Sequence, residues 1–122
     1  MSDTSLPPWL QEQLARYEQL QQNLQAVMGQ KQMLEAEMSE ADRAIEELKK
    51  AAIDAIVYKQ AGSVLIKSNK DDLLKELEEK KELTKTRIMV LGKQEDRIKA
   101  SLQEVQNKVN ESIKNKQTPP AS

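Results

Sequence analysis

Apolar residues recur along the chain in two heptad patterns, which are separated by a short stretch of different character. The first pattern spans residues 10–55 and the second spans residues 74–112. In both patterns apolar side chains fill most a and d positions over about six heptads, and most other positions are polar. A periodic pattern of this length is typical of a coiled coil and is rarely an ordinary globular helix.

The a and d positions predict a seam between two helices. In the first pattern they are Leu10, Gln13, Tyr17, Leu20, Leu24, Val27, Lys31, Leu34, Met38, Ala41, Ile45, Leu48, Ala52 and Ala55. In the second they are Leu74, Leu77, Lys81, Thr84, Ile88, Leu91, Glu95, Ile98, Leu102, Val105, Val109 and Ser112. Because the two patterns have similar lengths, they predict a long antiparallel two-helix coiled-coil hairpin in a mainly α protein. Each arm is expected to be roughly 60 to 70 Å long at 1.5 Å per residue.

Side-chain volumes indicate how the two arms are aligned. If facing residues have numbers that add to 129, Ala41 meets Ile88, so that a small side chain opposes a large one. The charged seam residues Lys31 and Glu95 then lie one layer apart and can pair. An alternative register, with numbers that add to 122, places Ala41 against Lys81 and is less favourable. We expect the first register, although the length of the loop allows both.

The segment between the heptads predicts a single small β-hairpin over residues 56–68. Gly62-Ser63 lies between two apolar runs and suits a two-residue type II′ turn, in which glycine takes the positive φ. One face of this ribbon then carries Val57, Lys59, Ala61, Val64 and Ile66, and the other carries Ile56, Tyr58, Gln60, Leu65 and Lys67. A lone ribbon with apolar groups on both faces and two open edges is marginal in water. It either folds back on the helix ends or joins ribbons of other subunits, and we expect the second.

Local signals set the expected boundaries of the helices. Pro8 suits the first helical position, where its missing N–H costs no hydrogen bond. Ser68 or Asn69 can cap the second helix, and Asp71 and Asp72 place negative charge on its first turn, where the helix dipole favours it. The predicted order is a disordered end (1–7), helix one (8–55), the hairpin (56–68), helix two (69–116) and a second disordered end (117–122).

Composition excludes several classes of function. The chain has 122 residues, of which 32% are charged, with a net charge of −1 and mixed signs along both arms. Nucleic-acid binding is disfavoured, because it needs a clustered excess of Lys and Arg. No run of 18 apolar residues is present, so no membrane span is expected. With no secretory signal and no cysteine, the expected location is the cytoplasm.

Residues suited to catalysis are also lacking. The chain has no histidine for proton transfer near neutral pH and no thiol. Gly92-Lys93 lacks the further residues of a nucleotide-binding loop. The adjacent acidic pairs Glu46-Glu47 and Asp71-Asp72 point to different sides of their helices, so they do not converge on a metal. We therefore expect no enzyme activity, no cofactor, no catalytic residue and no metal site.

The hairpin and the flanking arms together resemble the β-type subunit of prefoldin, also called GimC, over roughly residues 9–113. The resemblance is carried by Val57-Tyr58-Lys59, by Gly62-Ser63-Val64-Leu65-Ile66-Lys67, by Lys85-Thr86-Arg87-Ile88, and by Leu91, Gln94 and Glu95. The hairpin segment is the more specific part, whereas heptads alone fit many coiled coils. The insert is too short for the two hairpins of α-type subunits, which favours the β type.

The resemblance implies a hetero-hexamer of two α-type and four β-type subunits. Their hairpins form a double β-barrel platform that carries six coiled-coil arms, and unfolded proteins are captured between the arm tips and passed to a group II chaperonin. The assembly residues are then expected in the hairpin: Ile56, Val57, Tyr58, Val64, Leu65 and Ile66. The function implied is that of an ATP-independent molecular chaperone, or holdase.

Apolar side chains also gather at the open end of the predicted coiled coil. These expected client-binding residues are Leu6, Trp9, Leu10, Leu14, Val109 and Ile113. Exposed apolar clusters usually mark interaction sites, although the same residues can simply close the end of the seam. Met28, Met33 and Met89 offer a second adaptable surface, whereas Met38 is expected in the core. A structural adaptor that docks one folded partner is the alternative function.

Overall fold

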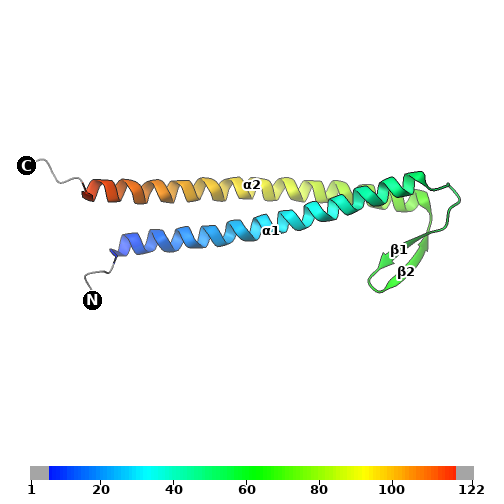
Figure 1. The fold of residues 1–122 in the computed structure, drawn as a ribbon, viewed down its shortest axis with the longest axis horizontal. Helices are drawn as coiled ribbons and strands as arrows, with labels where there is room; N and C mark the ends of the chain where they lie inside the picture. The colour runs from blue at the N-terminus through cyan, green and yellow to red at the C-terminus, as the bar shows by residue number, and fades with distance from the viewer. Residues whose placement is uncertain (1–5, 118–122) are drawn as a thin grey trace, which may run out of the picture. The chain divides into compact units, whose positions relative to one another are not determined.

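Two long helices with a two-stranded antiparallel sheet between them form this chain, here seen in a computed structural model (Figure 1). The structure describes residues 6–117, with side chains through residue 114. The elements are α1 (Pro8–Lys50), β1 (Val57–Ala61), β2 (Val64–Ser68) and α2 (Lys70–Gln117). The predicted fold class, two long helices joined through one β-hairpin, is confirmed.

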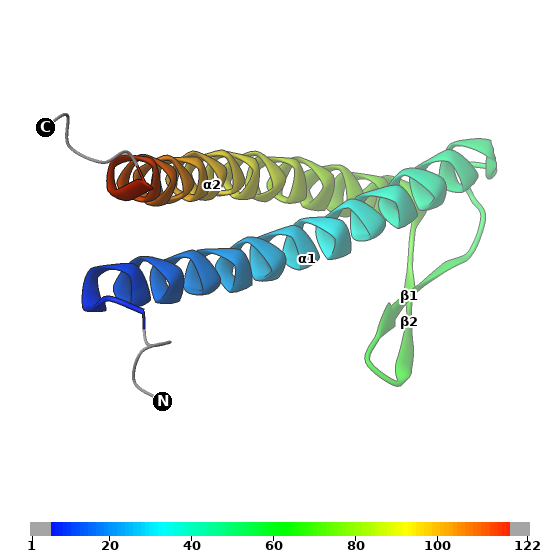
Figure 2. The same cartoon turned by 60° about the vertical axis from the view of Figure 1, so that its left-hand side comes forward.

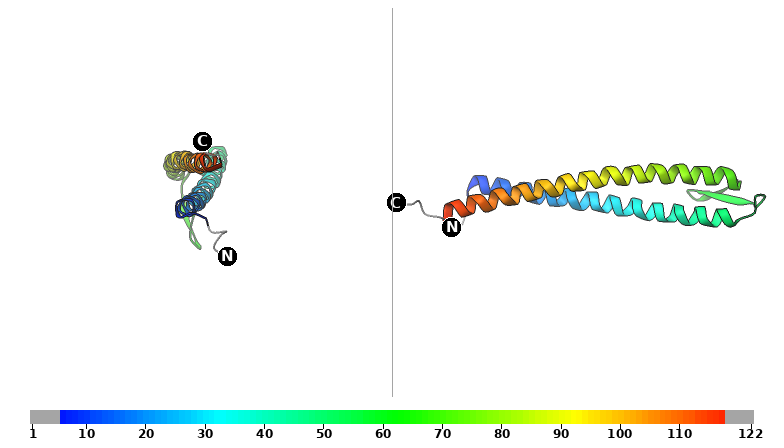
Figure 3. Two further views of the ribbon diagram at one scale, coloured as in Figure 1. Left: turned by 90° about the vertical axis from the view of Figure 1, so that its left-hand side faces the viewer. Right: turned by 90° about the horizontal axis from the view of Figure 1, so that it is seen from above.

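The chain forms two compact units, which we describe separately. The terminal unit comprises Met1–Gly29 and Leu91–Ser122, and the hairpin unit comprises Gln30–Val90. In the terminal unit the first turns of α1 and the last turns of α2 run side by side in opposite directions (Figures 1 and 3). In the hairpin unit β1 and β2 lie beside the end of α1 and the start of α2 (Figure 3).

The predicted a and d positions of both helices carry covered side chains. From Leu10 to Leu48 in α1, and from Leu74 to Ser112 in α2, every such residue is buried or half-buried. The most deeply buried residues are Ala41, Ile45, Leu48 and Thr84 in the hairpin unit and Val105 in the terminal unit. The heptad assignment is therefore confirmed over these ranges, whereas Ala52, a predicted a position, is exposed and lies beyond the end of α1.

The expected register was wrong, and the alternative one is observed. Lys81 Nζ on α2 lies 2.7 Å from Asp42 Oδ1 on α1, and these residue numbers add to 123. In the terminal unit, Tyr17 and Val105 line one hollow, and their numbers add to 122. Side-chain volumes predict the wrong register because they take no account of the reach of Lys81. Although Lys81 faces Ala41, its side chain extends to Asp42, so that its charge does not stay in the apolar seam. This hydrogen bond and the carboxylate charge raise the pKa of Lys81 above its ordinary value.

Helix α1 ends at Lys50, five residues before its predicted end at residue 55. Lys70, the first residue of α2, donates from Nζ to the carbonyl oxygens of Lys49 at 3.2 Å and of Ala51 at 2.7 Å. The last carbonyls of a helix lack intrahelical partners and attract positive charge. The capping residue is distant in the sequence. The residues just after Lys50, Ala51 and Ala52, therefore contain no local signal that the helix ends there.

Local capping fixes the other helix ends as expected. Pro8 is the first residue of α1, and Pro7 O accepts hydrogen bonds from the amides of Leu10 and Gln11, both at 3.0 Å. Asn69 caps α2, because its Oδ1 accepts a hydrogen bond from the Asp72 amide at 2.9 Å. Of the ends predicted to be disordered, residues 1–5 and 118–122 lie outside the described part. Residue 117, predicted to be disordered, is the last residue of α2.

Two charged seam residues give a first testable prediction. Lys31 is half-buried and the Glu95 side chain is only 13% exposed, although both occupy a positions. Polar seam residues specify register at a cost in stability. We expect the double substitution Lys31→Leu/Glu95→Leu to raise the Tm by roughly 4 °C, which corresponds to about 1 kcal/mol. Thermal unfolding followed by circular dichroism measures the change.

The matched control places leucines on exposed positions of the same helices, as Glu40→Leu/Lys93→Leu. The control is expected to leave the Tm within about 1 °C, because its side chains remain in water. A lower Tm for the seam variant would mean that Lys31 and Glu95 stabilise the folded chain more than leucine does.

Candidate interaction sites

The β-hairpin has the register predicted from its turn. Ala61 pairs with Val64, Lys59 with Ile66, and the pairing continues to Val57 with Ser68. Gly62 has a φ of +62°, and no described non-glycine residue has a positive φ. A positive φ at only the first central position is the type II′ pattern, which suits the right-handed twist of the strands.

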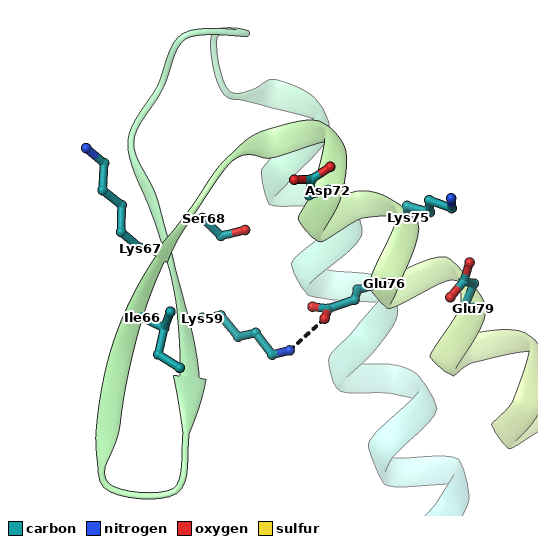
Figure 4. A pocket seen from close by; sticks show the side chains of 8 residues that line it. All are labelled: Lys59, Ile66, Lys67, Ser68, Asp72, Lys75, Glu76 and Glu79. Atoms are coloured by element: carbon teal, nitrogen blue, oxygen red, sulfur yellow. Dashed lines mark hydrogen bonds and ion pairs between the residues drawn. The ribbon is translucent and has the colours of Figure 1, made fainter.

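The two faces of the hairpin differ in their surroundings. Figure 4 shows the Lys59 side chain pointing toward α2 and the Lys67 side chain pointing away from it. Residues on the Lys59 face are covered at the root of the hairpin, where Val57 and Ser68 are half-buried. Toward the turn, the same face leaves Val64 and Ile66 exposed. The large apolar residues of the hairpin therefore remain in contact with solvent on both faces.

Two features orient the hairpin relative to α2. Lys59 Nζ lies 2.6 Å from Glu76 Oε1 across a hollow of about 450 Å³, and both groups are partly exposed (Figure 4). Asn69, the only residue between β2 and α2, is itself the helix cap. These two attachments set the direction of the ribbon relative to the start of α2. An exposed ion pair contributes little stability by itself, so its main effect is to orient the hairpin.

The predicted assembly residues are exposed with one exception. Among them Ile56, Tyr58, Val64, Leu65 and Ile66 are between 51% and 67% exposed, and Val57 is half-buried. Sequence reasoning missed a further apolar residue, Ile53, which is 77% exposed. The sequence predicts Ile53 inside helix one, but α1 ends before it, so Ile53 lies in the loop that leads to β1. The local sequence gives no sign of this early end.

In the terminal unit, the first turn of α1 is organised around Leu6 and Gln11. Gln11 Nε2 donates a hydrogen bond of 2.7 Å to the carbonyl oxygen of Leu6. This bond holds Leu6 against the start of the helix, although Leu6 itself is not helical. Figure 2 shows the start of α1 in blue and the end of α2 in red, the two helix ends that carry the predicted client-binding residues.

These helix ends are only partly covered. Leu6, Leu14 and Ile113 are exposed by 38% to 44%, and Trp9, Leu10 and Val109 are half-buried. Leu14 and Val109 line a shallow hollow of about 150 Å³ together with Tyr17, Val105 and Gln106. Beside this hollow in the sequence, Gln13 occupies a d position, and its Oε1 is buried without a hydrogen-bond partner in the described structure. The seam therefore carries an unsatisfied polar group next to this hollow.

The exposure of the methionines agrees with their positions in the heptads. Met38 is half-buried at its seam position. Met28, Met33 and Met89 are exposed, with Met33 at 68% and Met89 at 58%. Flexible exposed methionines are an alternative client surface, because methionine adapts its shape to a partner.

The described residues offer neither a metal site nor a membrane span. Within residues 6–117, no cluster of acidic side chains is arranged to hold a metal ion. Neither α1 nor α2, over the same part of the chain, is apolar enough along its length to cross a membrane.

Comparisons with known proteins agree over nearly the whole chain. A sequence model of the prefoldin subunit family matches residues 11–116. A prefoldin subunit beta of Archaeoglobus fulgidus is 42% identical over 104 residues, which are 85% of this chain and 90% of that protein. The prefoldin subunit beta of Pyrococcus furiosus is 36% identical over 110 residues, which are 90% of this chain and 94% of that protein.

Solved structures give the same result. The crystal structure of the prefoldin beta subunit from Thermococcus strain KS-1 superimposes with a TM-score of 0.82 at 34% identity, and the match covers 95% of this chain and 98% of that one. The prefoldin beta2 subunit of the same strain gives 0.68 at 25% identity over 75% of this chain and 97% of that one. The family match to residues 11–116 includes both arms and the hairpin, so the earlier resemblance is confirmed. The chain belongs to the prefoldin family of chaperone subunits and is of its β type.

Proposed function

We propose that this chain is a subunit of an ATP-independent holdase, which captures unfolded polypeptides at the ends of its helices and transfers them to a group II chaperonin. Membership of the prefoldin family implies assembly with other prefoldin subunits. The complex we propose is a hetero-hexamer of two α-type and four β-type subunits that acts in the cytoplasm. Their hairpins build a shared β-barrel platform.

The observation that carries this proposal is that exposed apolar side chains occur both on the hairpin and at the helix ends of a prefoldin family member. One set lies on the hairpin, around Tyr58, Val64 and Leu65, and is suited to assembly. The other lies at the helix ends, around Leu6, Leu14 and Ile113, and is suited to client capture. Monomeric soluble proteins rarely leave large apolar patches without a use.

Capture by the second set requires only apolar contact. Unfolded chains expose many apolar side chains, and each buried CH₂ contributes about 0.8 kcal/mol. Several weak contacts made by different subunits of one complex reinforce each other through effective concentration. Such binding is broad in specificity and needs no nucleotide, which matches the lack of a nucleotide-binding loop in the sequence.

Suppression of aggregation tests the function directly. The chain is combined with an α-type prefoldin subunit, and a chemically unfolded test protein is diluted into the mixture while light scattering is followed. We expect about one hexamer per client to suppress aggregation, equally well with and without ATP. Addition of a group II chaperonin with ATP is then expected to release folded client.

The alternative function predicts a different result. A structural adaptor would leave the aggregation of unrelated unfolded proteins unchanged and would instead bind one folded partner with a fixed stoichiometry. If scattering is the same with and without the complex for several unrelated clients, the holdase proposal is wrong.

A further inference from the structure

We propose that Lys70 is a positioning residue, which keeps residues 51–55 out of helix α1 and thereby sets where the hairpin leaves that helix. Its ammonium group satisfies carbonyl oxygens that would otherwise be satisfied by a longer α1. The consequence for assembly rests on the proposed function, because it assumes that the hairpin joins this chain to other subunits. The effect on the helix does not depend on that assumption.

Two carbonyl oxygens at the end of α1 are satisfied in either of two ways. In an α-helix each N–H donates to the carbonyl four residues earlier. A longer α1 would therefore bond the Ile53 N–H to the Lys49 oxygen, and the Ala55 N–H to the Ala51 oxygen. In the structure these oxygens accept from Lys70 Nζ, at 3.2 and 2.7 Å. The Ala55 amide donates instead to the carbonyl three residues earlier, at 3.0 Å, which closes a turn.

The segment after α1 itself favours a helix. Three of residues 51–55 are alanine, the strongest helix former. Ile53 and Asp54 disfavour a helix by less than glycine does, and the segment holds neither glycine nor proline. Ala52 and Ala55 also continue the heptad at a and d positions. The contact with Lys70 is therefore the signal that ends α1.

The start of α2 holds Lys70 in place for this contact. Lys70 is the first residue of α2 and follows Asn69, whose side chain caps that helix. The Lys70 side chain is half-buried, so its contact with the end of α1 is partly shielded from water. Lys49 and Lys50 also lie in the last turn of α1, but both are exposed, and Lys50 Nζ lies 3.5 Å from Glu47 Oε1. Lys70 is therefore the cation that reaches the last carbonyls.

The end of α1 determines where the hairpin begins. Residues 51–56 connect α1 to β1 (Figure 1). An α1 extended through residue 55 would be about 7.5 Å longer at 1.5 Å per residue, and only Ile56 would remain as the connection. The root of the hairpin would then have to move. We expect this movement to break the 2.6 Å contact of Lys59 Nζ with Glu76 Oε1, which orients the hairpin.

Nuclear magnetic resonance of the full-length chain tests the effect on the helix. Lys70→Met keeps a side chain of similar length but removes its charge and its donors. We expect the Cα chemical shifts of residues 51–55 to become helical, and the amides of Ile53 and Ala55 to exchange at least tenfold more slowly than in the wild type. Lys70→Arg keeps charge and donors and should match the wild type. The matched control, Lys75→Met, removes an exposed lysine further along α2 and should also match it.

Glycine substitutions separate positioning from a general loss of stability. Each glycine disfavours a helix by roughly fivefold relative to alanine. Adding Ala51→Gly and Ala52→Gly to Lys70→Met is therefore expected to return residues 51–55 to non-helical shifts. If Lys70→Met merely loosens the fold, the two glycines would loosen it further and would restore nothing.

The unmodified chain provides a measurement that needs no variant to fold. At low temperature and mildly acidic pH, the ammonium protons of Lys70 should exchange with water at least tenfold more slowly than those of Lys75, because they are held by two carbonyl oxygens. Equal exchange at the two lysines overturns the proposal.

Assembly with an α-type subunit, measured by native mass spectrometry, tests the consequence for the oligomer. We expect Lys70→Met to assemble at least tenfold more weakly and the added glycines to restore assembly. Wild-type shifts in a folded Lys70→Met chain overturn the positioning role and leave the proposed function standing. Helical shifts with wild-type assembly overturn the consequence for the oligomer. If the wild-type chain itself does not assemble, the proposed function is wrong, whereas the result on the helix stands.

Discussion

Two charges on one face of the hairpin are expected to dismantle the oligomer while the helices remain folded. Val64 and Ile66 are 59% and 51% exposed in the single chain and lie on the same face of the ribbon. Burial of each in a joint contributes roughly 1.5 to 3 kcal/mol, and a buried unpaired carboxylate costs several kcal/mol more. Val64→Asp/Ile66→Asp should therefore weaken assembly by at least 100-fold, because each 1.4 kcal/mol is a factor of ten.

Native mass spectrometry measures the oligomer, and circular dichroism measures the helices. The helical signal is expected to stay unchanged, because the seam residues of α1 and α2 are untouched. A matched control is Leu83→Asp/Val90→Asp, which charges two residues of α2 that are 55% and 49% exposed. The control should assemble normally. If the hairpin variant keeps the wild-type mass, the ribbon is not the joining surface and the barrel proposal fails.

Much of the fold follows from the periodicity of the sequence. The apolar residues at a and d positions predict which side of each helix is covered, because a coiled-coil seam must be continuous. The turn at Gly62-Ser63 predicts the hairpin register, since a two-residue turn fixes which residues pair. In both cases the information is local, and the structure agrees with it.

The wrong predictions concern features that are determined by contacts between residues far apart in the sequence. The end of α1 is set by Lys70, which caps it from the start of α2, and no residue near Lys50 announces the stop. The register depends on the reach of Lys81 to Asp42, and side-chain volumes at the seam do not contain that information. Because the early end of α1 is not visible locally, the heptad pattern predicts Ile53 inside a helix, whereas it lies exposed in the loop between α1 and β1.

The interaction sites are less predictable than the fold for a different reason. A seam position is recognised by its spacing, but an exposed apolar residue such as Leu14 at a helix end has no distinctive spacing. Its assignment depends on where the helix begins and how far the seam is closed, as at Gln13 and the hollow beside Val105.

Removal of the helix ends is expected to abolish client capture and to leave the oligomer intact. The deletion takes residues 1–14 and 109–122, which include Leu6, Leu14 and Ile113. Along the chain it ends about 40 residues from either strand, and it falls in the terminal unit, whereas the whole hairpin belongs to the other unit. Native mass spectrometry should therefore show a truncated hexamer. In the aggregation assay, at least ten times more of it should be needed for the same suppression.

A milder variant separates loss of contact from loss of helix. The substitutions Leu6→Ser, Leu14→Ser and Ile113→Ser keep both helices but remove the three exposed apolar groups, so they should reproduce most of the defect of the deletion. The control, Met33→Ser/Met89→Ser, removes apolar groups that are 68% and 58% exposed, more than the three helix-end residues are, and should suppress aggregation normally. If instead the methionine variant fails while the truncated hexamer holds clients at full strength, the client site lies along the helices, because the methionines and not the helix ends would then supply the apolar contact.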